Sequence, residues 1–358
     1  MNEAALTEAY ISLRRNYNDL HVVAGADVDP SGFTLLAILR NEMYFLPAFL
    51  LHYRQLGVER FVFLNDRSDD GSFEYLVDQP DVTVVESRRS FGDLLEVPID
   101  VSGEIQTPRI EYFWRSLLHE MFTPERWALQ VDLDEFIDLP EGMKLPDLVR
   151  ILDKQHLRAV WGVMLDCYPQ DIGELEIQKN LSHLDLNARW YFDGEQHFRL
   201  RKNRRPKTIY PGARARLYRN YNADDLFPEQ RIGAKEKIAR LRYFSRSGVR
   251  TRQYNAIHKQ ILIKWSSQCY FKNSHSTNLN ISYNHLIPIQ HFKFSGSLFQ
   301  KIELATGENM HSNGSRDYYL LLKLLKIMKR YNGSFLYQKS RQIHSFFDFQ
   351  DTGNAFGL

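Results

Sequence analysis

Short apolar runs alternate with amphipathic stretches over the first third of the sequence, and this alternation constrains the fold most strongly. Phe33 to Leu39, Phe61 to Leu64 and Val82 to Val85 are apolar and bounded by polar residues, a pattern typical of buried strands. An amphipathic helix is expected up to about Leu56, where Gly57 favours its end. The order strand, helix, strand, helix, strand predicts a parallel sheet with right-handed crossovers.

The central stretch Trp127 to Phe136 (WALQVDLDEF) begins as a buried strand and ends in carboxylates. In an extended backbone, residues two apart point to the same face, so Asp132 and Asp134 are expected to converge. Two such carboxylates repel each other unless a cation lies between them, and Mg²⁺ or Mn²⁺ prefers oxygen ligands. A solvated acid pair at a turn is the alternative, but the apolar lead-in and the rest of the chain favour the metal.

Further polar residues follow the other expected strands. Arg40 and Asn41 come after the first strand, Asp66 after the second, and Asp166 after another buried run, Ala159 to Leu165. Open sheets of this kind bind ligands beyond the carboxyl ends of their strands, so these side chains are expected to share one site. The glycine fingerprint GxGxxG is absent after the first strand, so a metal or basic side chains must hold any phosphate.

The stretch from Arg199 to Arg219 contains nine basic residues and no acid. A solvated face is the default for such a run. As a strand, Gly212 to Leu217 would place Arg214 and Arg216 on one side, where two guanidinium groups suit a diphosphate or an anionic acceptor. RNA is the rival ligand for this stretch, but it carries no RNA-binding motif and the net charge of the chain is only +2, so no nucleic-acid partner is expected.

Near the end of the chain, Leu286 to Phe294 (LIPIQHFKF) carries His291 and Lys293 on one face of an extended run. The stretch from Asp317 (DYYLLLKLLKIMKRY) predicts a helix that packs on the core or rests on an anionic membrane surface, and core packing is favoured. No segment is apolar enough to span a bilayer, and no signal peptide is expected. We therefore expect a cytoplasmic protein, with a peripheral contact at the inner membrane face left open.

Taken together, ILRNEMYFLPAFLLHYRQLGVERFVFLNDRSDDGS, WALQVDLDEF, MLDCYP, GARARLY and HFKF resemble the family 2-type glycosyltransferases of the GT-A fold. The similarity is to the bacterial branch whose metal motif reads DxDEF, and it covers about Phe33 to Tyr319. It implies an α/β fold with a Rossmann-like, mostly parallel central sheet flanked by helices and a C-terminal acceptor-side region. The expected parts are an N-terminal extension (1–29), a nucleotide-sugar-binding half (30–165), an acceptor-side half completing the metal site (166–310) and a C-terminal helical segment (311–358).

The resemblance also implies roles for individual residues. Asp132 and Asp134 would bind the metal and the donor diphosphate, His291 would complete the metal shell, and Lys293 would neutralise a phosphate oxygen. The other residues expected to bind the nucleotide sugar are Arg40, Asn41, Glu42, Asn65, Asp66, Arg214 and Arg216.

The resemblance leaves the catalytic base open, because the acidic pair and the QxxRW motif of many family 2 enzymes are missing. Asp166 is the first candidate, since it ends a strand beside the expected donor site; capping of the following turn is its alternative role. Glu135 and Asp171 are weaker candidates. The missing motifs also argue against a processive membrane polymerase.

We therefore expect a Mn²⁺- or Mg²⁺-dependent transferase that moves a sugar from a UDP- or GDP-sugar to a glycan or glycolipid acceptor. A role in bacterial surface polysaccharide biosynthesis would follow. The alternatives are a nucleotidyltransferase and a catalytically silent sugar- or partner-binding module on the same fold. A nucleotidyltransferase should carry a glycine-rich basic loop after the first strand, and the sequence RNEMY there is not such a loop.

Overall fold

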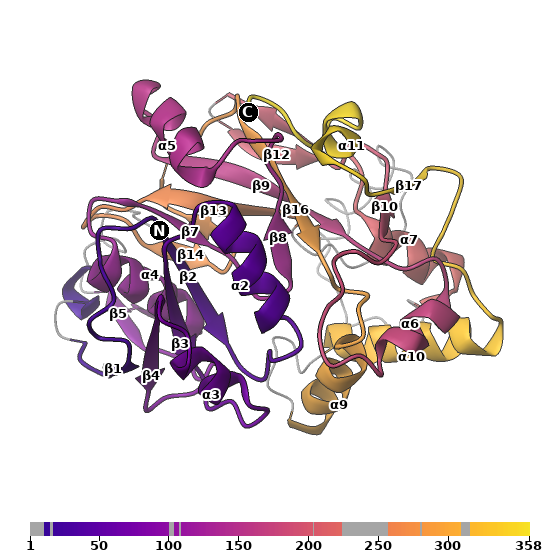
Figure 1. The fold of residues 1–358 in the computed structure, drawn as a ribbon, viewed down its shortest axis with the longest axis horizontal. Coiled ribbons are helices and arrows are strands. Elements are labelled where there is room, and N and C mark those ends of the chain that lie inside the picture. Colours follow the sequence, from indigo (N-terminus) through magenta and orange to yellow (C-terminus); the bar gives the residue numbers. More distant parts are fainter. Residues whose placement is uncertain are drawn as a thin grey trace.

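A computed structural model describes residues 11–14, 17–99, 104–106, 109–202, 204–223, 257–279, 281–308 and 316–358. Within these residues, a central nine-stranded sheet has the order β1-β4-β3-β2-β7-β13-β9-β16-β8 (Figure 1). In chain order its strands are β1 (Leu20–Ala24), β2 (Thr34–Leu39), β3 (Arg60–Asn65), β4 (Val82–Ser87), β7 (Trp127–Gln130), β8 (Glu135–Ile137), β9 (Ala159–Asp166), β13 (His258–Lys264) and β16 (Leu286–His291).

Most strands of this sheet run in one direction, as the sequence predicts. β4, β3, β2 and β7 are parallel neighbours. β13 runs antiparallel between β7 and β9, so β9 points the same way as β7, and β16 is parallel to β9. Only β1, β13 and β8 run the other way in this sheet. The carboxyl ends of β2, β7, β9 and β16 therefore meet at one edge.

Helices cover both faces of the sheet because alternate residues of each buried strand point to opposite sides. On one side, Leu35 and Ala37 of β2 belong to a core cluster with α2 (Leu46–Gln55) and α5 (Leu145–Lys154). On the other side, Leu36 and Ile38 pack with α4 (Ile110–Phe122). The sheet is thus the middle of three layers, and the predicted mixed α/β class is confirmed.

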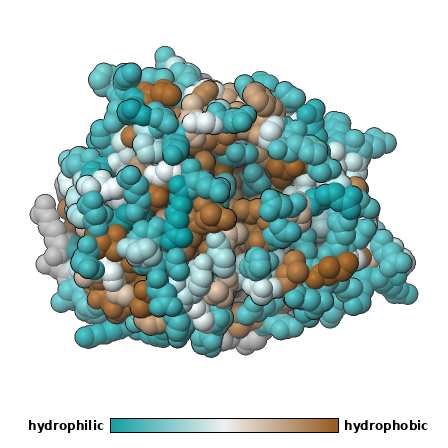
Figure 2. All heavy atoms as spheres, in the orientation of Figure 1, coloured by the Kyte–Doolittle hydropathy of each residue, from teal (hydrophilic) through white to brown (hydrophobic). Residues whose placement is uncertain are grey.

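A second group of helices packs together beside the sheet (Figure 1). It consists of α6 (Ile172–Gln178), α7 (Ala213–Asn220), α9 (Leu298–Glu308) and α10 (Arg316–Arg330). Four leucines of α10, Leu320, Leu321, Leu324 and Leu325, are buried in this cluster, so the expected core packing of that helix is confirmed. In Figure 2, apolar side chains are scattered among hydrophilic ones over this face, and one apolar group lies at the right, where α6 and α10 lie in Figure 1. One exposed apolar side chain of α6 is Ile177.

The remaining elements are short. They are α3 (Ser72–Val77), α11 (Phe346–Asp351) and four two-stranded sheets, β5 (Val97–Ile99) with β6 (Glu104–Gln106), β10 (Tyr191–Asp193) with β17 (Ser340–Gln342), β11 (Phe198–Arg201) with β12 (Arg204–Thr208), and β14 (Phe271–Asn273) with β15 (Ser276–Thr277). Among the helices that the structure describes, none combines the length and the apolar character that crossing a membrane requires.

One sequence prediction about local structure is wrong. The predicted strand from Gly212 to Leu217 is the helix α7, because alanine and arginine are strong helix formers and Gly212, with φ +87°, turns the chain into its first residue. The predicted N-terminal extension is not wholly separate from the sheet. Its segment Leu20 to Ala24 forms β1 and pairs with β4.

Candidate functional site

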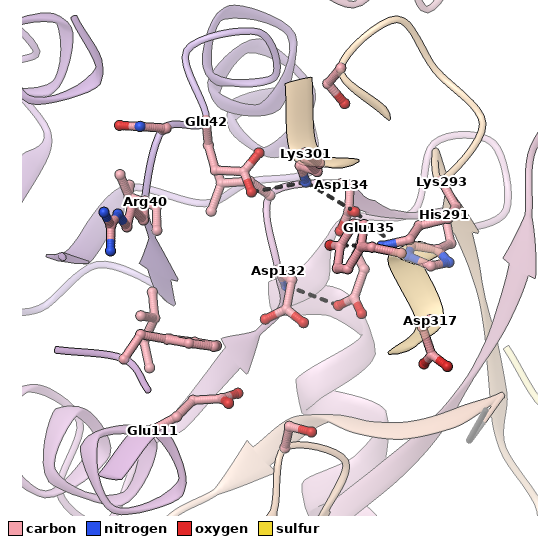
Figure 3. Close-up of a pocket in the computed structure, with 18 of the residues that line it drawn as sticks. Arg40, Glu42, Glu111, Asp132, Asp134, Glu135, His291, Lys293, Lys301 and Asp317 are labelled. Atoms are coloured by element: carbon pink, nitrogen blue, oxygen red, sulfur yellow. Dashed lines mark hydrogen bonds and ion pairs between the residues drawn. The ribbon is translucent and has the colours of Figure 1, made fainter. Parts of the chain in front are cut away.

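A cavity of about 440 Å³ lies where β2, β7, β9 and β16 end, and it gathers most of the predicted site residues (Figure 3). The predicted residues that line it are Arg40, Asn41, Glu42, Asp132, Asp134, Arg214, His291 and Lys293. Other charged residues in the lining are Arg109, Glu111, Arg115, Glu135, Lys301 and Asp317. The cavity therefore combines several carboxylates with several cations at the sheet edge where open α/β sheets bind ligands.

The orientation of His291 is set by Asp166. The register of β9 and β16 pairs these two residues, and Asp166 Oδ1 lies 2.6 Å from His291 Nδ1. The other Asp166 oxygen accepts a hydrogen bond from Arg214 Nε at 2.8 Å. Burial opposes ionisation, but Arg214 and His291 hold the pKa of the Asp166 carboxyl well below its usual range. An ionised carboxylate can only accept, so Nδ1 carries a hydrogen, and Nε2 faces the cavity, where it can bind a metal once it has given up its own proton.

Asp134 lies on the Nε2 side of this histidine. Its Oδ2 is 3.7 Å from His291 Nε2 and 3.3 Å from Lys301 Nζ, and Lys301 also contacts Glu42 Oε1 at 2.9 Å. Glu42, Lys301, Asp134 and His291 thus form a row in Figure 3. Burial disfavours the ionised form of Asp134, yet Lys301 and His291 hold the pKa of this carboxyl well below its usual range. These charges compensate one another across the row.

The expectation that Asp132 and Asp134 converge on one strand face is wrong. β7 ends at Gln130, and the two aspartates lie in the turn before β8 rather than in an extended backbone. Asp132 turns to other partners, Arg115 and Lys259, each at 2.8 Å. Burial alone would raise the pKa of Asp132, but these two cations hold it well below the usual range. The expected repulsion between the two acids is therefore replaced by two separate sets of cations.

The predicted arginine pair is also separated. Residues two apart on a helix project about 200° from each other, and α7 turns Arg214 and Arg216 toward different acids. Arg214, which lines the cavity, reaches the buried Asp166, whereas Arg216 contacts Asp193 with two hydrogen bonds, of 2.7 and 3.0 Å. Arg216 is buried and does not line the cavity, so its expected contact with the donor is not supported.

Asn65 and Asp66, predicted to bind the nucleotide, lie at the end of β3 but not in the cavity lining. Asn65 donates from Nδ2 to Glu86 and accepts from the Ser68 backbone. Asp66 accepts from the backbone of Phe91 through Oδ2, while its buried Oδ1 has no hydrogen-bond partner. Burial raises the pKa of Asp66. Asn65 therefore has a clear structural role, and Asp66 keeps one acceptor atom unused.

The three candidate bases all have other roles in this structure. Both Asp166 oxygens are occupied, as described above, so capping is not its function and it holds His291 instead. Glu135 is buried against Lys259 at 2.7 Å. Asp171 caps α6 by accepting from the Glu174 backbone at 3.0 Å. None of these three is placed as a free base.

Sequence reasoning missed three cations of the site. Lys301, on α9, contacts Asp134; Arg115, on α4, and Lys259, on β13, contact Asp132. No local motif marks these residues. Lys301 and Lys259 lie 167 and 127 residues from their partners, and Arg115 lies on the preceding helix, 17 residues before Asp132. The one available signal is a buried lysine in an apolar strand, as in HKQILIK for Lys259, since a lysine there requires an acid.

The fit to a divalent metal ion can be judged from these atoms. Among the described residues, no group of three or more histidine, cysteine or acidic side chains is arranged to hold a metal alone. Asp134 and the oriented His291 offer two ligand atoms 3.7 Å apart. Mg²⁺ commonly takes one or two protein ligands and completes its shell with water and substrate phosphates. The pair therefore fits an ion that arrives together with a phosphate-bearing substrate.

No protein-family model matches this chain, and no curated protein matches it either.

Proposed function

We propose that the protein is a Mn²⁺- or Mg²⁺-dependent glycosyltransferase with a GT-A type fold, acting on a nucleotide-sugar donor and a glycan or glycolipid acceptor. The observation that carries this proposal is the contact of His291 with Asp166, which leaves Nε2 facing Asp134 Oδ2 at 3.7 Å. Such a carboxylate–histidine pair is the usual support of a metal-binding imidazole. The position at the carboxyl edge of the sheet supports the same reading.

In this proposal Asp134 and His291 would hold the ion, together with the phosphates of the donor. The ion would supply a charge that stabilises the leaving nucleoside diphosphate. Lys293 lines the same cavity, with Nζ 3.4 Å from the Tyr318 hydroxyl, and is suited to contact a phosphate oxygen. Asp132, although held by Arg115 and Lys259, also lines the cavity and is available to donor hydroxyl groups.

Glu42 is the carboxylate of the described cavity that we propose as the base for the acceptor hydroxyl. Its Oε2 is buried and has no hydrogen-bond partner, so one acceptor atom is unused. Burial, together with Asp134, raises the pKa of Glu42 to about 7, although Lys301 opposes the shift. A base with a pKa near the working pH transfers protons most effectively. This assignment replaces Asp166 as the expected base.

The test is hydrolysis of a panel of UDP- and GDP-sugars with Mn²⁺, comparing the wild type with Asp134→Ala. The proposal predicts slow, Mn²⁺-dependent release of the nucleoside diphosphate by the wild type and a loss of at least about 100-fold in the variant. Activity unaffected by the substitution would exclude the proposed site. Binding of a sugar nucleotide without any turnover, with or without acceptor glycans, would favour the silent binding module.

A further inference from the structure

Lys301 lies between the two carboxylates at the centre of the site. Its Nζ is 2.9 Å from Glu42 Oε1 and 3.3 Å from Asp134 Oδ2, and the side chain is 17% exposed. The ammonium also lies 4.8 Å from the centre of the Phe45 ring. Lys301 belongs to the first turn of α9, the helix that forms one wall of the cavity. A lysine so deeply placed is held by its charge partners rather than by water.

The oxygen that Lys301 contacts is the same one that faces His291. Asp134 Oδ2 is shared between an ammonium at 3.3 Å and the imidazole Nε2 at 3.7 Å. A divalent ion bound by Asp134 and His291 would need this oxygen, and its double charge would repel an ammonium in contact with the same atom. Lys301 and the ion therefore compete for Asp134.

We propose that Lys301 is an exchangeable counter-ion, which pairs with Asp134 while no divalent ion is bound and turns to a donor phosphate oxygen once the ion takes Asp134. The inference rests on the proposed function and adds a residue that couples ion binding to donor binding. Ligands of one small ion lie beside each other, so a phosphate on the ion would lie within reach of the same flexible four-carbon side chain. Glu42 gives the ammonium a second anchor during the exchange.

The exchange predicts two opposite effects for Lys301→Met, which removes the charge and keeps an unbranched side chain. Without nucleotide, Mn²⁺ affinity should rise about fivefold to tenfold, because the competing cation is gone. With Mn²⁺ present, the affinity for UDP or GDP should fall by about tenfold, because a phosphate contact is lost. Electron paramagnetic resonance of free Mn²⁺ measures the first effect and isothermal titration calorimetry the second. If Lys301 had a purely structural role, Lys301→Met would lower both the Mn²⁺ affinity and the affinity for UDP or GDP.

Three further variants separate competition from a general change in charge. Lys301→Arg keeps a cation and should retain the low Mn²⁺ affinity of the wild type. Lys293→Met removes a cavity cation whose Nζ lies at Tyr318, and it should raise Mn²⁺ affinity less than Lys301→Met does. Lys326→Met, on the exposed side of α10, should change neither affinity. If Lys301→Met does not fold, Lys301→Gln, which keeps a polar group near Glu42, is measured instead.

The possible outcomes separate this inference from the proposed function. Mn²⁺ affinity in Lys301→Met that is equal to or below the wild-type value would overturn the exchange. A rise no larger than that of Lys293→Met would overturn it as well. Wild-type protein that binds no Mn²⁺, with or without nucleoside diphosphate, would overturn the proposed function and with it the exchange.

Discussion

Asp166 and His291 occupy paired positions at the ends of two neighbouring parallel strands, and Asp166 Oδ1 lies 2.6 Å from His291 Nδ1. The contact fixes the tautomer of the imidazole, since the ionised carboxylate can only accept. It also explains why Asp166 is not available as a base. Its role is to position the one nitrogen donor of the proposed metal site.

The first prediction concerns this positioning role. Asp166→Asn should weaken Mn²⁺ binding, measured in the presence of UDP or GDP by calorimetry, by about 10-fold to 100-fold. The amide can present its NH₂ group to Nδ1, which removes the constraint on the tautomer. Asp171→Asn, at the cap of α6 and outside the cavity lining, is the matched control and should leave Mn²⁺ binding unchanged. Equal Mn²⁺ affinity in Asp166→Asn and the wild type would remove the positioning role.

The second prediction separates the two arginines of α7. Arg216→Met breaks a buried ion pair with Asp193 and should lower the free energy of unfolding by about 3 kcal/mol in urea titrations. Mn²⁺ affinity of the folded variant should stay at the wild-type value, because Arg216 does not line the cavity. Arg214→Met should instead weaken Mn²⁺ binding, since it frees one Asp166 oxygen. A donor-binding defect in Arg216→Met without loss of stability would restore the role expected from sequence.

The third prediction concerns the pH dependence of stability. The pKa of Glu42 rises from 4.5 to about 7 on folding, because of burial and despite Lys301. The folded state therefore binds more protons than the unfolded state between these values, and stability falls as pH rises through this window. Glu42→Gln removes this pH dependence. The difference in the free energy of unfolding, Glu42→Gln minus wild type, should therefore increase by about 2 to 3 kcal/mol between pH 4.5 and pH 7. Urea titrations at several pH values measure it.

The other titratable groups of the site lose their contribution to stability outside this pH window, or contribute equally in Glu42→Gln and the wild type. Asp134 and Asp166 have depressed pKa values, so their stabilising contributions are complete above their ordinary pKa and are lost only in more acidic solution. Burial favours the neutral imidazole of His291, but Asp134 and Asp166 outweigh the effect of burial and raise its pKa. Its contribution falls as pH rises above 6.5, in both proteins alike. A difference between Glu42→Gln and the wild type that does not vary with pH would exclude the raised pKa of Glu42.

Much of the sheet could be predicted from the sequence because its strands are continuous apolar runs. Phe33 to Leu39 and Ala159 to Leu165 are confirmed as strands to within a residue at each end. The helices between the early strands explain why β2, β3 and β4 run in one direction. Arg40, Asp134 and His291 lie in one cavity at the carboxyl edge of the sheet. The antiparallel insertion of β13 could not be predicted, since nothing in HKQILIK indicates which neighbours that strand pairs with.

The parts of the site that sequence reasoning missed depend on long-range charge pairing. The alternation of arginine with small or apolar residues around Arg214 and Arg216 fits a strand as well as a helix. The high helix propensity of alanine and arginine favours the helix that is observed. Asp132 and Asp134 follow the strand rather than continue it, so the rule for extended backbone does not apply. Lys301 is separated from Asp134 by 167 residues, a distance at which no motif can link them.

The most direct test of the proposed site is Mn²⁺ binding measured by electron paramagnetic resonance, with and without UDP or GDP, in the wild type and in Asp134→Asn. We predict weak Mn²⁺ binding by the wild type alone and an affinity at least about 10-fold higher with the nucleoside diphosphate, because the phosphates complete the ion's ligands. Asp134→Asn should lose this increase. Nucleoside diphosphate binding that is equally strong without Mn²⁺ and in Asp134→Asn would contradict the account.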